Sequence, residues 1–180
     1  MKFFLYLPLF FAFICVEMAA EEYVGVDFVE EKAVRYEGAV SVYVSYPSPG
    51  YGEWMNPGCG FMTTHGVRFN KIDFFLGASV GVDLQIPWFP VPALVAGIQP
   101  KYYFVDRSKT EFFVLVEGGY IIDGYGSDAG YVMPGIGVGF KLKRNQRIDL
   151  SLDVRTVIGD YVSADRPVVA YPHLAVGYRF

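Results

Sequence analysis

A strict alternation of apolar and polar side chains is the feature that most restricts what this chain can fold into. In residues 147–155, every even position carries an aliphatic side chain, and every odd position carries a charged residue or a serine. Because successive side chains of a strand point to opposite faces, this pattern indicates a strand with two different faces. The same period of two recurs in residues 73–83 and 135–142. The sequence therefore predicts an all-β fold.

Eight segments of the chain predict strands, and no segment between them predicts a helix. The connections alternate in length, as in an up-and-down meander of the bacterial outer membrane with short periplasmic turns and longer outer loops. The predicted strands are residues 36–46, 59–69, 73–83, 94–104, 111–122, 135–142, 147–155 and 170–180. The short turns are 70–71, 106–110 and 144–145, and the longer connections are 47–57, 84–92, 123–130 and 158–168.

The polar face of these predicted strands carries charges of both signs and many glycines. Small side chains suit a crowded interior, and charges of both signs suit an interior in which they pair. The bulkier apolar face is then the outside of the molecule, in contact with lipid. The residues predicted to form a polar network in the lumen are Asp73, Lys101, Glu117, Lys141, Asp149, Asp153, Arg155, His173 and Arg179.

A sheet with this polarity is expected to close on itself. In hydrocarbon, an open edge would cost on the order of several kcal/mol for each exposed backbone group. The predicted fold class is a closed eight-stranded antiparallel up-and-down transmembrane β-barrel. Because the interior of an eight-stranded barrel is just filled by side chains, the lumen charges predict a packed ion-pair network. A narrow channel is the weaker alternative.

The N-terminal region predicts export from the cytoplasm. Lys2, an apolar run over residues 3–16 and small residues at positions 19–20 are typical of a cleaved secretory signal peptide, here residues 1–20. Residues 21–34 are predicted to be a periplasmic lead segment, and residues 35–180 the outer-membrane barrel. Cleavage leaves Cys59 as a lone cysteine, so no internal disulfide is expected. The net charge of −4 argues against nucleic-acid binding, which needs a basic face.

Several stretches of the chain also resemble a known family. They are "RYEGAVSVYVSY", "TTHGVRFNKIDFFLGASVGVD", "VAGIQPKYYFVDRSKTEFFVLVEGGY", "GYVMPGIGVGFKLKRNQRIDLSLDVR" and "AVGYRF". Together they resemble the small outer-membrane β-barrel proteins of Bacteroidota, which are grouped with porin-like and OmpX- or OmpA-like barrels. The resemblance runs from about residue 35 onward, and it implies an eight-stranded barrel in the Gram-negative outer membrane. It implies little about activity, because most members have none assigned.

Aromatic residues are expected to form a girdle where the barrel meets the membrane surface. On the side of the short turns, the predicted girdle contains Tyr102, Phe104, Phe112, Tyr178 and Phe180. A final aromatic residue on the lipid face is also typical of outer-membrane barrel proteins. We therefore expect Phe180 to be recognised by the barrel-insertion machinery, and outer-membrane lipid to surround the wall.

The predicted function is non-enzymatic: a structural role, or recognition of a protein or glycan by the extracellular loops. The loop residues that predict such recognition are Tyr51, Trp54, Trp88, Phe89, Tyr125 and Tyr161. No cofactor is expected. No metal is expected either, because two histidines and one cysteine on different strands match no common ligand spacing.

The alternative function is a lipid A-modifying enzyme of the deacylase type, which needs a base beside a hydroxyl nucleophile. His65 lies next to Thr63 and Thr64 in the sequence, and its parity points to lipid. The His-x-Ser-Asn signature of such deacylases is absent, because His65 is followed by Gly66, Val67 and Arg68. His173 has the parity of the lumen and is expected to lie near Asp149 or Asp153. A soluble lipocalin-like barrel is a third and weaker alternative.

Overall fold

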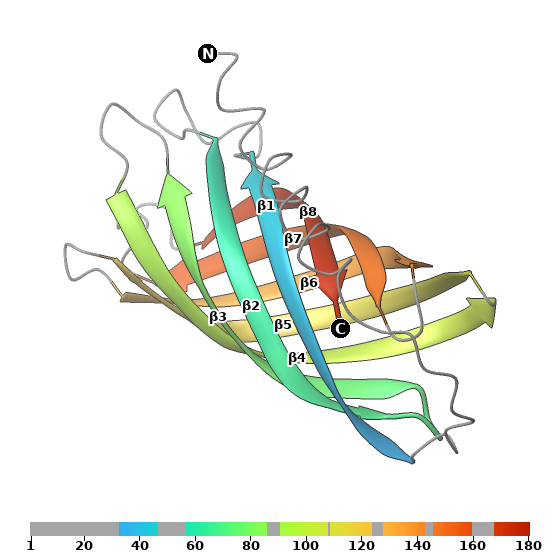
Figure 1. The fold of residues 1–180 in the computed structure, drawn as a ribbon. Helices are drawn as coiled ribbons and strands as arrows, with labels where there is room; N and C mark the ends of the chain where they lie inside the picture. The colour runs from blue at the N-terminus through green and yellow to red at the C-terminus, as the bar shows by residue number, and fades with distance from the viewer. Residues whose placement is uncertain are drawn as a thin grey trace.

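The computed structural model is a closed antiparallel barrel of eight strands in which each strand pairs with its neighbours in the chain and β1 pairs with β8 (Figure 1). The structure describes residues 33–46, 57–85, 91–107, 109–123, 128–142, 146–159 and 168–180. The predicted eight-stranded fold is confirmed. The strands are β1 (Val34–Ser45), β2 (Gly58–Phe69), β3 (Phe74–Gln85), β4 (Val91–Arg107), β5 (Thr110–Asp123), β6 (Asp128–Lys141), β7 (Arg147–Gly159) and β8 (Val168–Arg179).

The largest departure from the predicted strand boundaries is in β6. The sequence predicts a strand from residue 135, whereas β6 begins at Asp128. Tyr131 and Met133 are buried inside the barrel, and Val132 is exposed on the outside. Both faces of this stretch are therefore apolar, so the alternation that marks the other strands is hidden. Among the described residues there is no helix long and apolar enough to cross a membrane.

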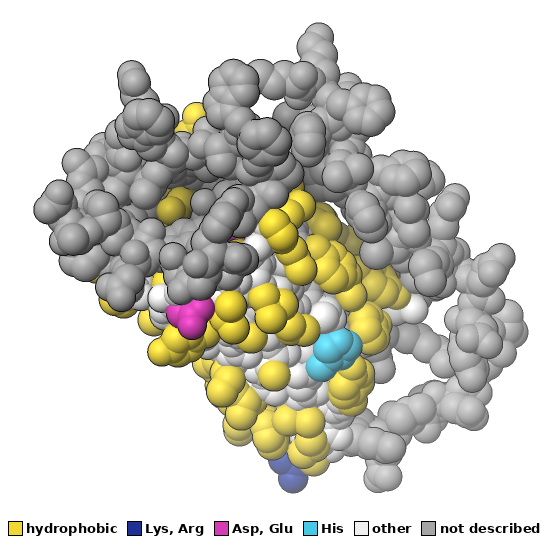
Figure 2. Space-filling view, turned by 90° about the vertical axis from the view of Figure 1, so that its left-hand side faces the viewer, with side chains coloured by type: hydrophobic (Ala, Val, Ile, Leu, Met, Phe, Trp, Pro, Cys, Tyr) yellow, Lys and Arg dark blue, Asp and Glu magenta, His cyan; other side chains and the backbone are white. Residues whose placement is uncertain are grey.

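The outer wall of the barrel is apolar, and its interior is charged. Ile136, Leu152 and Leu174 are 61%, 55% and 56% exposed, whereas Glu111 and Glu117 are fully buried. Hydrophobic side chains cover much of the described wall in the view of Figure 2. This polarity is the opposite of that of a soluble barrel, so the lipocalin-like alternative is not supported.

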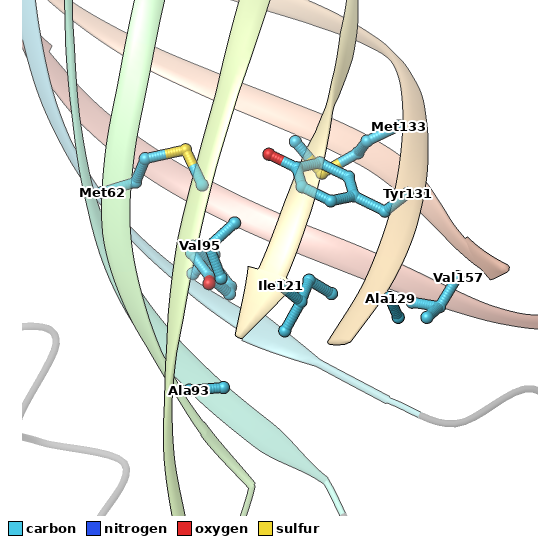
Figure 3. Packing of buried hydrophobic residues seen from close by; sticks show 9 residues of the cluster. Met62, Ala93, Val95, Ile121, Ala129, Tyr131, Met133 and Val157 are labelled. Atoms are coloured by element: carbon cyan, nitrogen blue, oxygen red, sulfur yellow. The ribbon is translucent and has the colours of Figure 1, made fainter. Parts of the chain in front are cut away.

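The interior also holds apolar and aromatic side chains that were not predicted from the sequence to lie there. One cluster lies mainly toward the longer connections, and Figure 3 shows its members directed into the barrel from several strands. A second cluster is formed by Phe75, Tyr103, Phe113 and Leu115. Glycines make room for these rings: an added Cβ would collide with the Phe113 ring at Gly137 and with the Phe75 ring at Gly77. The larger cluster consists of Tyr43, Met62, Ala93, Val95, Ile121, Ala129, Tyr131, Met133 and Val157.

Two prolines interrupt the pairing of strands at the middle of the barrel. The β4–β5 register passes from Ile98 to Lys101 and leaves Gln99 and Pro100 unpaired with β5, while Pro100 still pairs with β3. The β6–β7 register likewise passes over Met133 and Pro134. Proline has no N–H to donate to a neighbouring strand, which accounts for a local break beside each one.

The barrel closes where β8 meets β1. Pairing runs from Ala39 opposite Arg179 to Ser45 opposite His173. Gly38 and Phe180 extend it with two backbone hydrogen bonds, of 2.9 Å and 2.8 Å. The Phe180 ring lies over Gly38 on the outer wall, and a Cβ at Gly38 would be only 2.7 Å from Cε2 of that ring. Glycine therefore leaves room for the ring here, and a larger residue would force the ring to shift.

Candidate functional site

The interior near the short turns holds an ion-pair network centred on Glu111. This fully buried carboxylate receives guanidinium groups from three strands, with N–O distances of 2.6 Å to Arg68, 2.7 Å to Arg179 and 3.4 Å to Arg147. Each of these residues is close to the short-turn end of its strand, and the alternation of the strand directs its side chain inward. Glu111 therefore ties β2, β5, β7 and β8 together across the barrel. We call Glu37, Arg68, Lys101, Tyr103, Glu111, Arg147, Asp149 and Arg179 the turn-side network.

Tyr103 is the aromatic centre of the turn-side network. Its hydroxyl donates a hydrogen bond to Glu37. The guanidinium carbons of Arg68 and Arg179 lie 3.9 Å and 4.8 Å from the centroid of its ring. Arg68 and Arg179 also lie 3.7 Å from the Glu37 carboxylate. Ring faces attract cations, so the tyrosine holds two arginines that would otherwise repel each other.

Lys101 and Asp149 form the inner edge of this network. Asp149 is 2.9 Å from Arg179 through one oxygen and 3.8 Å from Lys101 through the other. The Lys101 ammonium also lies 4.6 Å from the centroid of the Phe113 ring. Among the described residues, the pair with Asp149 is the only ion pair of Lys101, and it is long.

A second polar group lies nearer to the longer connections. Asp83 and Arg155 form an ion pair of 2.6 Å, and the guanidinium carbon lies 5.2 Å and 5.1 Å from the ring centroids of Tyr43 and Tyr131. Glu117 accepts hydrogen bonds from the Tyr131 hydroxyl and, at 2.7 Å, from Gln99. We call Tyr43, Asp83, Gln99, Glu117, Tyr131, Asp153, Arg155 and His173 the loop-side group.

Asp153 and His173 complete the loop-side group from neighbouring positions on β7 and β8. Ser151 donates a 2.9 Å hydrogen bond to Oδ2 of Asp153. The His173 ring stacks on Tyr43, with the ring centroids 4.9 Å apart. Both residues are buried, as their inward parity requires.

A cavity of about 60 Å³ separates the two polar groups. Lys101 and Asp149 line it from the turn-side network, and Gln99, Asp153 and His173 line it from the loop-side group. Hydroxyl groups of Ser41, Thr64 and Ser151 also face it. We call this cavity the chamber. Apolar side chains such as Phe113 and Leu115 line it as well, and its volume is large enough for a few water molecules, since one water molecule needs roughly 10–15 Å³ by this measure.

The structure places most of the predicted lumen residues inside the barrel. Lys101, Glu117, Asp149, Asp153, Arg155, His173 and Arg179 are buried. The prediction is wrong for Lys141, which is exposed. Its parity is that of the interior, but it is the last residue of β6, where the strand has already left the filled part of the barrel. Asp73 is also exposed; it lies in the turn before β3 with a φ of 50°, and its carboxylate is 3.3 Å from Arg68.

Five charged residues of the interior were missed by the sequence prediction. They are Glu37, Arg68, Asp83, Glu111 and Arg147, and all five are buried. Their parity was available as a signal, because each continues the inward positions of its own strand. Glu111 shares the parity of Glu117, for example, and Arg147 that of Arg155.

His65 lies on the outer wall, as its parity predicts. Its Nε2 atom is 2.7 Å from the Thr63 hydroxyl, and its Nδ1 atom is hydrogen-bonded to the Tyr36 hydroxyl. The ring also makes an edge contact with Phe180, with centroids 6.4 Å apart. Both ring nitrogens therefore have neutral hydroxyl partners, and among the described residues no carboxylate contacts His65. His65 belongs to the half of β2 that is closer to the short turn.

The six aromatic residues predicted for loop recognition (Tyr51, Trp54, Trp88, Phe89, Tyr125 and Tyr161) lie outside the described residues. The predicted signal peptide lies outside them as well. Within the described part of the chain, no group of three or more His, Cys, Asp or Glu side chains could hold a metal ion.

Comparisons with known proteins define the class of this fold. No protein-family model matches the sequence, and no curated protein matches it. The crystal structure of Neisserial surface protein A is similar over 82% of this chain and 96% of its own, with 17% identity and a TM-score of 0.59. The N-terminal β-barrel domain of Pseudomonas aeruginosa OprF is similar over 80% of this chain and 97% of its own, with 12% identity and a TM-score of 0.50. Both are eight-stranded outer-membrane β-barrels, and this chain has their fold.

Proposed function

We propose that this chain is a non-enzymatic integral protein of the Gram-negative outer membrane with a side-chain-filled lumen. Its role is then structural, or it recognises a partner through its extracellular loops. The observation that carries the proposal is the inverted polarity of the barrel, with aliphatic side chains on the wall and charged side chains inside.

The wall is suited to hydrocarbon rather than to water. Leaving apolar surface in water costs about 25 cal/mol for each Å², and this wall exposes large side chains from every strand. The sheet is closed and therefore has no open edge strand, as a bilayer requires. Exposed Tyr102, Phe104 and Phe112 lie toward the short turns, where an interfacial girdle is expected.

The same geometry supports an orientation in the membrane. Short turns of outer-membrane barrels face the periplasm, which puts the longer connections outside the cell. Partners at those connections are then a protein or a glycan, and lipid surrounds the wall. We also propose that residues 1–20 are a signal peptide and residues 21–34 a periplasmic lead segment. The insertion machinery then recognises Phe180, and the protein comes from a member of the Bacteroidota.

The filled interior supports a closed lumen over a narrow channel. Glu111 and its three arginines cross the barrel near the short turns, and the larger apolar cluster crosses it near the longer connections. A solute would have to displace both layers to pass.

Cell fractionation and permeability assays test this proposal. We expect the full-length chain, expressed in a Gram-negative host, to appear in the outer-membrane fraction and to resist extraction by alkaline carbonate. Purified protein in liposomes is expected to leave permeability to small sugars at the level of empty liposomes. Recovery in the soluble periplasm would contradict the location, and sugar uptake would contradict the closed lumen. A liposome preparation containing a known porin is the positive control.

Replacing His65 with alanine is expected to leave lipid A unchanged, because the structure gives little support to the deacylase alternative. The histidine has no carboxylate partner among the described residues, and it lies toward the periplasmic leaflet in the proposed orientation, whereas lipid A occupies the outer leaflet. Intact-mass spectra of lipid A from cells with the wild-type chain, with H65A and with no chain are expected to be identical. Loss of an acyl group that depends on the wild-type chain and disappears in H65A would establish the enzyme instead.

A further inference from the structure

The short-turn end of the barrel carries exposed positive charge. Lys71 lies in the turn between β2 and β3, Lys109 precedes β5, and Lys141 ends β6. All three side chains are exposed, and none of them forms an ion pair with another described residue. The backbone N–H of Lys141 donates a 2.9 Å hydrogen bond to the carbonyl of Lys109, so two of the lysines come from adjoining turns. We call Lys71, Lys109 and Lys141 the basic rim.

The sequence of the connections sets the two ends of the barrel apart. The connection after β6 adds Lys143 and Arg144 at the short-turn end. The four longer connections at the other end contain five acids and a single base, Arg166. An acidic segment is therefore attracted to the short-turn end and repelled from the other. The five acids of the longer connections are Glu53, Asp123, Asp128, Asp160 and Asp165.

Residues 21–34, which lead into the barrel, are such an acidic segment. They contain five acids and a single base, Lys32. Figure 1 shows the start of β1 beside the turn between β2 and β3. In that turn, the backbone N–H of Asn70 donates a 3.0 Å hydrogen bond to the carbonyl of Ala33, so the chain enters the barrel beside Lys71. The five acids of the lead segment are Glu21, Glu22, Asp27, Glu30 and Glu31.

The lead segment is long enough to reach the whole basic rim. Glu30 and Glu31 are separated from Ala33 by an extended chain of roughly 7–11 Å, so both can reach Lys71. The stretch from Glu21 to Ala33 can span roughly 40 Å. Neighbouring strands lie about 4.8 Å apart, so the mouth of an eight-stranded barrel is narrower than about 20 Å. Because the segment is covalently attached, its acids reach the rim at an effective concentration on the order of mM.

We propose that the acidic lead segment folds back across the short-turn mouth of the barrel and pairs with the basic rim. An exposed ion pair contributes little by itself, so the contact relies on several pairs formed by one tethered segment. The docked segment covers the opening beside the turn-side network and closes this end of the lumen from outside. This inference depends on the charges of the turns and of the lead segment, and not on the proposed location or role of the protein.

The mobility of a nitroxide label in the lead segment tests this contact. The label is attached through Phe28→Cys in a C59A background, and the full-length chain is purified in a zwitterionic detergent without lipid. We expect an immobilised label at low salt. In about 1 M NaCl, where the screening length falls to about 3 Å, the mobile fraction is expected to rise at least about threefold. The variant K71Q/K109Q/K141Q is expected to show the same rise already at low salt, whereas D73N, which removes an acid from the same end, is expected to keep the label immobilised.

An exchange of charges separates ion pairing from a general loss of structure. K71E/K109E/K141E is expected to free the label, and the addition of E22K/E30K/E31K to that variant is expected to immobilise it again. A mobile label in the wild type at low salt would overturn the proposal, and so would an immobilised label in K71Q/K109Q/K141Q. Transfer of the wild type into vesicles with and without phosphatidylglycerol is expected to leave the label immobilised in both. Release by phosphatidylglycerol alone would show that anionic lipid headgroups occupy the basic rim, and would also overturn the proposal.

Discussion

Replacing Glu111 with alanine is expected to lower the free energy of unfolding by about 3–5 kcal/mol, the usual effect of removing one partner from a buried ion pair. The substitution leaves Arg68, Arg147 and Arg179 buried together without the carboxylate that all three contact. Urea titration of the barrel refolded in lipid vesicles, followed by tryptophan fluorescence, measures the change.

Two further variants isolate the charge of Glu111. E111Q keeps the size of the side chain and removes its charge. Its free energy of unfolding is therefore expected to fall by most of the amount expected for E111A. D73N removes an exposed partner of Arg68 and is expected to cost about 1 kcal/mol or less, as exposed pairs usually do. A loss in E111A no greater than that in D73N would show that the turn-side network adds no stability.

Replacing Leu152 with arginine is expected to destabilise the barrel by about 2–4 kcal/mol in a bilayer, the cost of arginine near the midplane on a lipid-facing wall. Leu152 lies between the exposed residues Ile136 and Leu174 of the neighbouring strands. In water, the same change at an exposed position would alter stability by about 0.5 kcal/mol or less. The prediction therefore distinguishes a wall in lipid from a wall in water.

The matched control for this experiment is Leu142→Arg, an exposed leucine that follows β6 at the short-turn end. Near the interface, arginine is expected to cost about 0–1 kcal/mol. Both variants are measured by urea titration in vesicles of the same lipid. Equal and small losses at the two positions would contradict the proposed membrane placement.

Most of the strands could be predicted from the sequence because alternation is a local property. Residues 147–155 show both faces of β7 without reference to the rest of the chain, and the same holds for β3. Local alternation fails in residues 128–134, where Tyr131 and Met133 fill the interior opposite an apolar wall. Parity also cannot tell where a strand leaves the filled interior, which is why Lys141 was placed inside.

The grouping of interior residues could not be predicted from one sequence. Glu111 meets Arg68 from β2 and Arg179 from β8 because the strands are staggered around the barrel, and that stagger has no local signature. The chamber has the same origin, since Lys101 of β4 and His173 of β8 line it from strands that are far apart in the sequence. Parity gives the direction of a side chain, while the register decides which others it meets.

The contact between Gly38 and Phe180 has a consequence for the whole cylinder. A sheet of fixed strand number gains or loses diameter as its first and last strands slide past each other. Gly38 leaves room for the Phe180 ring at this approach, and the neighbouring positions of β1, Glu37 and Ala39, point inward. A slip by one residue would move the ring off Gly38 and turn the inward side chains of the shifted strand to the outside, so the register that sets the diameter of the barrel is also the one that keeps its charges inside.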